Sequence, residues 1–172
     1  MRRLLYAIII ISLSIVNPVL GSDDSAVLCK PDKIVIDKEL YKIEVEPIQI
    51  PWRDGWGPKS FRLKIFNKNT NNINILWDST YYLRDGKVDG IFCEFKGKTL
   101  RESETILPEQ SIERNIAPEN LARFDYTFGT LFRTGNTFFN REFPLGRNGI
   151  MLNMIIDDKK NVEQAEIDFI RK

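Results

Sequence analysis

The segment spanning residues 50–58 carries the side chains best suited to contact a ligand. It reads I-P-W-R-D-G-W-G-P, so Trp52 and Trp56 flank an Arg-Asp-Gly turn that prolines stiffen at both ends. Indoles on a stiff loop stack on a sugar ring or anchor a protein partner, because they offer a large, rigid contact area. Alternatively, the loop folds back and buries both indoles at one end of the domain. We take Trp52, Arg53, Asp54 and Trp56 as the candidate binding residues.

Groups that activate a nucleophile or bind a metal are scarce in this chain. It has no histidine and two cysteines, and it lacks the S-x-x-K and G-x-S-x-G patterns. These facts exclude Ser-His-Asp catalysis, histidine-based metal sites and a closed zinc site. The carboxylate pairs Glu102/Glu104 and Asp157/Asp158 have the residue types of a glycosidase site, but they lie in polar or alternating segments and are expected to be solvated. We predict a protein with no catalytic residues, no cofactor and no metal.

The first 21 residues have the composition of a secretory signal. Two arginines precede an apolar run at residues 4–16, and Gly21 supplies the small residue that signal peptidase requires. The run of about 13 residues is shorter than the roughly 20 that a membrane-spanning helix needs, so we expect cleavage, with retention as an anchor as the alternative. A lipid anchor at Cys29 is disfavoured, because Leu28 precedes it and a polar stretch separates it from the apolar run.

The charge balance indicates no polyanionic partner. The chain has 25 lysine and arginine residues against 24 aspartate and glutamate residues. Loss of the leader, with its two arginines, leaves 23 against 24. Such a protein has no basic field for nucleic acid and is not attracted to an anionic membrane. We expect a periplasmic or secreted protein, associated with the envelope, that has no integral membrane span after cleavage.

Export also predicts the state of the two cysteines. In an oxidising compartment Cys29 and Cys93 are expected to form a disulfide, which would attach the N-terminal segment to a later strand. Closing a loop of this length stabilises the fold by roughly 4 kcal/mol through the entropy of the unfolded chain. The alternative is a pair of buried thiols.

Period-two alternation of apolar and polar residues dominates the chain after the leader, as in the segment 41–46, and is typical of half-buried strands. Residues 117–122 predict one helical turn that begins near a proline, and Trp77 is expected to be a buried strand residue. Three hairpins are predicted: 61–66 with 73–77 across the asparagine-rich turn 67–72, 80–83 with 88–95 across Asp85-Gly86, and 150–156 with 165–171 across 157–161.

Short strands separated by turn signals predict an all-β chain, specifically an antiparallel immunoglobulin-like β-sandwich with at most one short helical turn. We divide it into a signal peptide at residues 1–21, an N-terminal lead-in at 22–39 and a β-sandwich domain at 40–172.

Several motifs resemble a group of small exported bacterial proteins. Residues 61–70 read F-R-L-K-I-F-N-K-N-T and residues 73–83 read I-N-I-L-W-D-S-T-Y-Y-L, with D-G-K at 85–87 and further matches at 105–111 and 116–118. The chain is similar over roughly residues 61–120 to envelope proteins and lipoproteins in which such an asparagine turn and I-x-I-x-W segment lie in an immunoglobulin-like sandwich. The resemblance implies that fold, and it implies little about activity because most of these proteins are uncharacterised. This chain departs from the pattern by lacking a lipobox cysteine.

The expected function is therefore binding. We expect a non-catalytic accessory protein of the bacterial cell envelope that recognises a protein partner through a sheet edge or through the Trp52–Trp56 loop. The alternative is a carbohydrate-binding module in which Trp52 and Trp56 are stacking platforms for a glycan.

Overall fold

A computed structural model describes residues 26–49, 57–94, 99–125 and 137–172 of the chain. These residues form strands joined by short turns, which confirms the all-β prediction. The strands are β1 (Val27–Lys30), β2 (Ile34–Asp37), β3 (Tyr41–Gln49), β4 (Pro58–Asn67), β5 (Ile73–Ile75), β6 (Tyr81–Arg84), β7 (Lys87–Glu94), β8 (Glu104–Ile106), β9 (Ser111–Pro118), β10 (Ala122–Asp125), β11 (Thr137–Asn140), β12 (Gly146–Ile156) and β13 (Lys159–Arg171).

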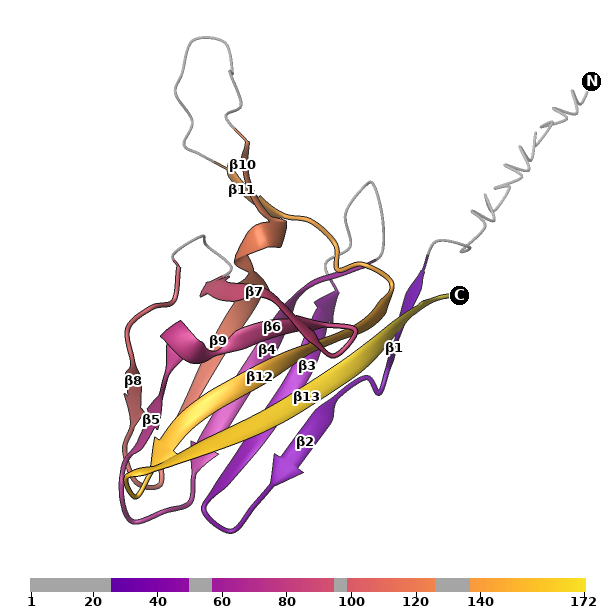
Figure 1. The fold of residues 1–172 in the computed structure, drawn as a ribbon. Helices are drawn as coiled ribbons and strands as arrows, with labels where there is room; N and C mark the ends of the chain where they lie inside the picture. Colours follow the sequence, from indigo (N-terminus) through magenta and orange to yellow (C-terminus); the bar gives the residue numbers. More distant parts are fainter. Residues whose placement is uncertain (1–25, 50–56, 95–98, 126–136) are drawn as a thin grey trace, which may run out of the picture.

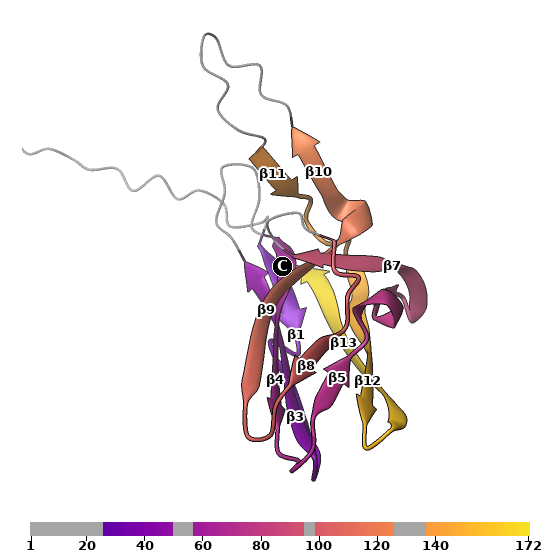
Figure 2. The same cartoon turned by 90° about the vertical axis from the view of Figure 1, so that its left-hand side faces the viewer.

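Eleven of these strands form one antiparallel, curled sheet (Figure 1). Its main path runs β1-β13-β12-β6-β7-β9-β4-β3-β2, and β5 and β8 extend the sheet beside β12. We call β1, β13, β12, β6, β5 and β8 the first arm, and β9, β4, β3 and β2 the second arm. The strands β10 and β11 pair only with each other and project from the sheet as a ribbon (Figures 1 and 2).

Two segments pass from one arm to the other and so bend the sheet. Residues 87–91 of β7 pair with β6, and residues 92–94 of the same strand pair with β9. On the opposite side, β1 pairs with β13 and β2 pairs with β3, with three residues between the two strands. Strands that switch partners in this way form the corners of a curled sheet. Residues 22–39, expected as a lead-in, thus supply two strands of the sheet.

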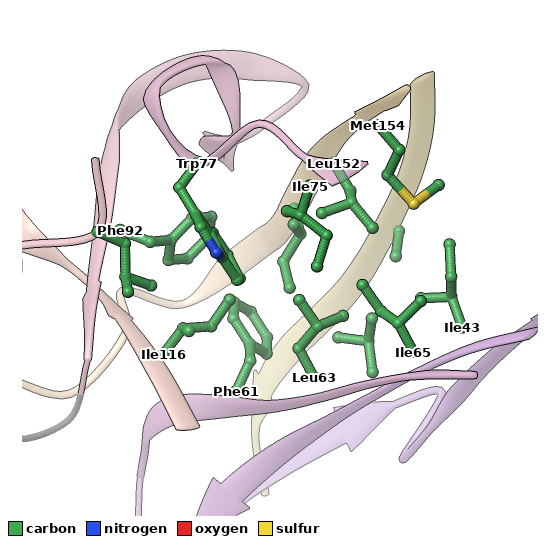
Figure 3. Close-up of a cluster of buried hydrophobic side chains, with 14 of the residues drawn as sticks. Ile43, Phe61, Leu63, Ile65, Ile75, Trp77, Phe92, Ile116, Leu152 and Met154 are labelled. Atoms are coloured by element: carbon green, nitrogen blue, oxygen red, sulfur yellow. The ribbon is translucent and has the colours of Figure 1, made fainter. Parts of the chain in front are cut away.

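The hydrophobic core lies between the two arms. Along β4, Phe61, Leu63 and Ile65 are buried while the alternate residues Arg62 and Lys64 are exposed, as period-two patterning requires. The buried cluster combines residues of both arms. Figure 3 shows Ile43, Ile75, Trp77, Phe92, Ile116, Leu152 and Met154, and Val45, Ile150 and Ile167 belong to the same cluster. The alternating residues of the sequence therefore define the inner and outer faces of each arm.

One predicted hairpin is wrong. The strands β4 and β5, which flank the asparagine-rich turn, do not pair: β4 lies between β3 and β9, and β5 lies between β12 and β8. The buried Asn67 stabilises this crossing by donating through Nδ2 to the carbonyls of Asn71 (2.9 Å) and Ile106 (3.0 Å). Its Oδ1 accepts from the amide of Asn69 at 2.8 Å. The turn thus carries the chain from the second arm to the first.

The other two hairpins are confirmed. Asp85 and Gly86 both have positive φ angles, 50° and 74°, between the paired strands β6 and β7. Asp157 and Asp158, with φ angles of 50° and 59°, form the whole turn between β12 and β13, which is tighter than the predicted 157–161 turn. Positive φ at both central residues matches the twist of the flanking strands.

The structure has two single-turn 3-10 helices in its described part, where the sequence predicted at most one helical turn. The turn η2 (Glu119–Leu121) falls within the predicted 117–122 segment. The turn η1 (Trp77–Ser79) lies between β5 and β6, so Trp77 is buried as expected but begins a helical turn and is not part of a strand. The expectation of a single turn is therefore wrong, because η1 is stabilised by contacts with the distant strand β12.

Candidate functional site

The predicted binding residues Trp52, Arg53, Asp54 and Trp56 lie outside the residues that the structure describes. They belong to the connection between β3 and β4, whose last pairing is Gln49 with Pro58. Their use in binding stays a prediction.

Within the described chain, a cleft of about 280 Å³ opens between β8 and β9, where the two arms separate beyond β7. The strand β8 belongs to the first arm and β9 to the second, and the two do not pair with each other. The residues that line the cleft come from η1, β7, β8, β9 and the segment before β8: Trp77, Glu94, Thr99, Leu100, Arg101, Glu102, Ser103, Glu104 and Arg114.

The carboxylate of Glu104 joins the two walls of this cleft. Its Oε2 accepts a hydrogen bond of 3.1 Å from Nε1 of Trp77, and its Oε1 accepts one from the Arg114 guanidinium of β9. The guanidinium also donates through Nη1 to the carbonyl of Glu113 at 3.0 Å, and its Nε lies 4.0 Å from Oε1 of Glu94. Trp77 lies between β5 and β6 of the first arm, and Arg114 lies on β9 of the second. Side-chain bonds therefore connect the two arms at the place where their backbones do not pair.

A network of backbone and side-chain bonds fixes the turn that carries Trp77. Asn153 of β12 is buried and donates through Nδ2 to the carbonyl of Ser79 at 2.5 Å. Its carbonyl accepts from the amide of Leu76 at 2.9 Å, and Thr80 Oγ1 donates to the Leu76 carbonyl at 2.8 Å. The indole points from this turn toward Ile116 of the other arm (Figure 3), and its N–H is directed at Glu104 in the cleft.

Carboxylates outnumber cations around the cleft. Arg101 and Arg114 are the cations of its lining, and Glu94, Glu102 and Glu104 are its carboxylates. At the rim, Glu119 accepts a hydrogen bond of 3.0 Å from Thr99 Oγ1 and lies 3.9 Å from the Arg101 guanidinium. A cleft with this excess of negative charge favours cationic groups.

Glu104 is a residue that the sequence interpretation missed. It was expected to be solvated, yet its side chain is only 21% exposed and bonded on both oxygens. Glu102, its predicted equivalent, is exposed as expected. No pattern in the sequence indicates that Glu104 is bonded in this way. Its partners Trp77 and Arg114 are 27 and 10 residues away and come close to it only in the folded chain.

The structure shows Cys93 as a thiol. It is buried, and its Sγ donates to the carbonyl of Ala117 at 3.4 Å, so the predicted bond to Cys29 is not present here. Cys29 is partly buried and packs against the core cluster. The disulfide stays a prediction for the exported chain.

Three buried groups, Cys93, Tyr82 and Tyr41, are held in their protonated forms. Burial, with a smaller contribution from the charge of Glu119, raises the pKa of the Cys93 thiol to about 11. Burial also raises the pKa of the Tyr82 hydroxyl above its ordinary value. For Tyr41, burial raises the pKa first, and its hydrogen bond of 2.5 Å to Glu163 adds to the effect. All three groups stay protonated near neutral pH, which is the unreactive form of each.

The part of the chain that the structure describes contains no group of three or more histidine, cysteine, aspartate or glutamate residues placed to hold a metal ion. None of its helices combines the length and the apolar character needed to cross a membrane.

The comparisons with models of protein families, with curated proteins and with solved structures find no match to this chain.

Proposed function

We propose that this chain is an exported, non-catalytic binding protein of the bacterial cell envelope, built as an immunoglobulin-like β-sandwich. It recognises a protein partner through a sheet edge or through the Trp52–Trp56 loop. The leader-like sequence at residues 1–21 supports export. The position of the core between two antiparallel arms supports the sandwich.

The unpaired strand edges at the cleft carry this proposal. In the described chain β8 pairs only with β5, and the first part of β9, before Ile116, pairs only with β4. An unpaired edge presents backbone N–H and C=O groups to which another chain can add a strand.

Photo-crosslinking in intact cells tests the proposal. The chain is produced with its own leader and carries a photoreactive amino acid at Thr105 on β8, at Trp52 in the loop, or at Lys64 on β4. Thr105 and Lys64 are both exposed, but β4 is paired on both sides, so Lys64 serves as the matched control. We expect a specific protein adduct at Thr105 or Trp52 and none at Lys64.

Two results would contradict the proposal. One is the absence of any specific adduct at both test positions; the other is hydrolysis of ester, peptide or glycoside substrates by the purified protein. Quenching of tryptophan fluorescence by oligosaccharides, abolished in Trp52→Ala, would instead support the carbohydrate-binding alternative.

A further inference from the structure

We propose that the opening between β8 and β9 accepts an extended segment of the partner protein that places a lysine or arginine side chain in the cleft beside Trp77. This inference rests on the proposed function and makes it specific. It selects one edge of the sheet and one chemical class of partner segment.

Two other edges of the sheet carry residues that oppose strand addition. One is the side of β13 away from β12, which is unpaired over residues 159–167 in the described chain and begins with Lys159 and Lys160. The other, formed by β1 and β2, is divided into two strands of four residues, and Lys30, Pro31 and Lys33 lie at or between them. Lysine and proline are the residues with which natural proteins block edge pairing. In contrast, β8 and residues 111–115 of β9 contain neither lysine nor proline. The opening at β8 and β9 therefore lacks the residues that block a guest strand.

The size and lining of the cleft fit one long side chain. Its volume of about 280 Å³ lies below the range of roughly 300–1,000 Å³ that is typical of small-molecule sites. Leu100 and the indole of Trp77 are buried and apolar, and carboxylates surround them. Lysine and arginine bury an aliphatic stem along apolar surface and keep their charge among polar groups. A cationic side chain of a guest strand thus matches both parts of the lining.

The carboxylates that are least engaged in internal contacts determine that the guest side chain is cationic. Glu104 is already bonded to Trp77 and Arg114. Glu94 has a longer contact, 4.0 Å from the Arg114 Nε, and Glu102 is exposed at the rim. A guest ammonium or guanidinium would contact these two carboxylates, whereas an acidic side chain would be repelled by them.

The backbone geometry accounts for the extended form of the guest. A segment that adds to the open part of β9 points alternate side chains toward the cleft and toward solvent. We therefore expect extended binding sequences in which one basic residue stands at a position that points toward the cleft.

The test is a selection from a phage-displayed library of twelve-residue peptides on the protein secreted with its own leader. Selected peptides are synthesised, and their affinities are measured by fluorescence anisotropy. The chain has three tryptophans, so the indole N–H signals in a ¹H–¹⁵N spectrum report the location of binding. The Trp77 signal is assigned with Trp77→Phe. We expect basic peptides to shift the Trp77 signal while those of Trp52 and Trp56 stay in place.

Charge reversal provides the second readout. Glu94→Lys with Glu102→Lys is expected to weaken binding at least about tenfold, because two attractive charges become repulsive. The control, Glu39→Lys with Asp168→Lys, makes the same change of net charge at exposed positions away from the cleft and is expected to leave the affinity within about twofold. Affinity for the unmodified protein should fall as salt is added.

Three outcomes would overturn the inference. They are a selection that yields no binding peptide, selected peptides without basic residues, and binding that shifts only the Trp52 and Trp56 signals. The third outcome would leave the proposed function intact and move the contact to the loop. Failure of the proposed function is detected separately, by the absence of adducts in intact cells.

Discussion

The indole N–H of Trp77 and the carboxylate of Glu104 are joined by a hydrogen bond of 3.1 Å at the base of the cleft between β8 and β9. The same carboxylate accepts from Arg114 of the facing arm. One side chain therefore satisfies a buried donor of the first arm and a cation of the second, at the place where the backbones of the two arms are not paired.

Replacing Glu104 should destabilise the fold. Glu104→Ala leaves the Trp77 N–H and the partly buried guanidinium without this acceptor, and we expect the free energy of unfolding to fall by about 1–3 kcal/mol. Glu104→Gln keeps an acceptor oxygen and should lose less. Urea denaturation measures both changes. Glu113→Ala, on the more exposed neighbour of Arg114, is the control and should stay within about 0.5 kcal/mol of the parent protein. Equal effects at the two positions would contradict this role of Glu104.

The buried pair of Tyr82 and Asn148 offers a second test. The Tyr82 hydroxyl donates to Asn148 Oδ1, and both side chains are fully buried. Tyr82→Phe leaves that oxygen without its donor, which should lower the free energy of unfolding by about 1–3 kcal/mol. Tyr81→Phe is the matched control, because Tyr81 is half-buried on the opposite face of the same strand, and we expect a change within about 0.5 kcal/mol.

Tyr82 also predicts a loss of stability in alkali. Burial raises its pKa in the folded state, whereas in the unfolded chain a tyrosine ionises near its ordinary pKa of about 10. Above that pH the unfolded state binds fewer protons than the folded state, so stability falls as pH rises further. Urea midpoints measured from neutral pH into this range should show the decline, and Tyr82→Phe should reduce its slope. An unchanged slope in the variant would refute the assignment.

The Cys93 thiol should be unreactive in the folded protein. Its pKa of about 11 makes the thiolate fraction at pH 8 more than about 100-fold smaller than for an ordinary thiol with a pKa near 8.5. In Cys29→Ser, alkylation of Cys93 by iodoacetamide at pH 8 should be slower by at least that factor than in denaturing urea. Comparable rates would contradict the burial of Cys93. The mass of the unmodified protein, produced with residues 1–21, decides the predicted disulfide, which lowers the mass by two hydrogen atoms.

Glycine substitutions in the β12–β13 turn can distinguish relief of backbone strain from the loss of side-chain hydrogen bonds. Asp157 and Asp158 both have positive φ angles, so glycine relieves backbone strain at either position. Only for Asp157 does the structure show side-chain bonds to the asparagine-rich turn, from Asn69 Nδ2 at 3.1 Å and Asn71 Nδ2 at 2.8 Å. Asp158→Gly should stabilise the protein by up to about 1 kcal/mol. Asp157→Gly should be less stable than Asp158→Gly by about 1–3 kcal/mol, as thermal or urea unfolding can show.

The two confirmed hairpin turns are determined by the turn residues themselves and by the strands next to them. Asp85-Gly86 and Asp157-Asp158 tolerate positive φ and are flanked by alternating strands, so neighbouring residues alone select the hairpin. The asparagine-rich turn after Asn67 has the same outward signs, yet it connects two strands that never pair. The Asn67 side chain donates hydrogen bonds to backbone carbonyls that a hairpin partner strand would otherwise pair. The turn sequence alone does not show whether these bonds come from a side chain or from a paired strand.

The amino-acid sequence by itself determined the strand class, the inner and outer faces of most strands and two of the three hairpins, because side-chain alternation and turn chemistry act over a few residues. Only the tertiary structure decided which strands are neighbours and that Trp77, Glu104 and Arg114 meet at one cleft. The physical reason is that pairing depends on contacts between segments far apart in the chain. The alternating pattern of β4 or β5 is compatible with several neighbouring strands. The packing of both arms around one core determines which of these strands becomes the neighbour.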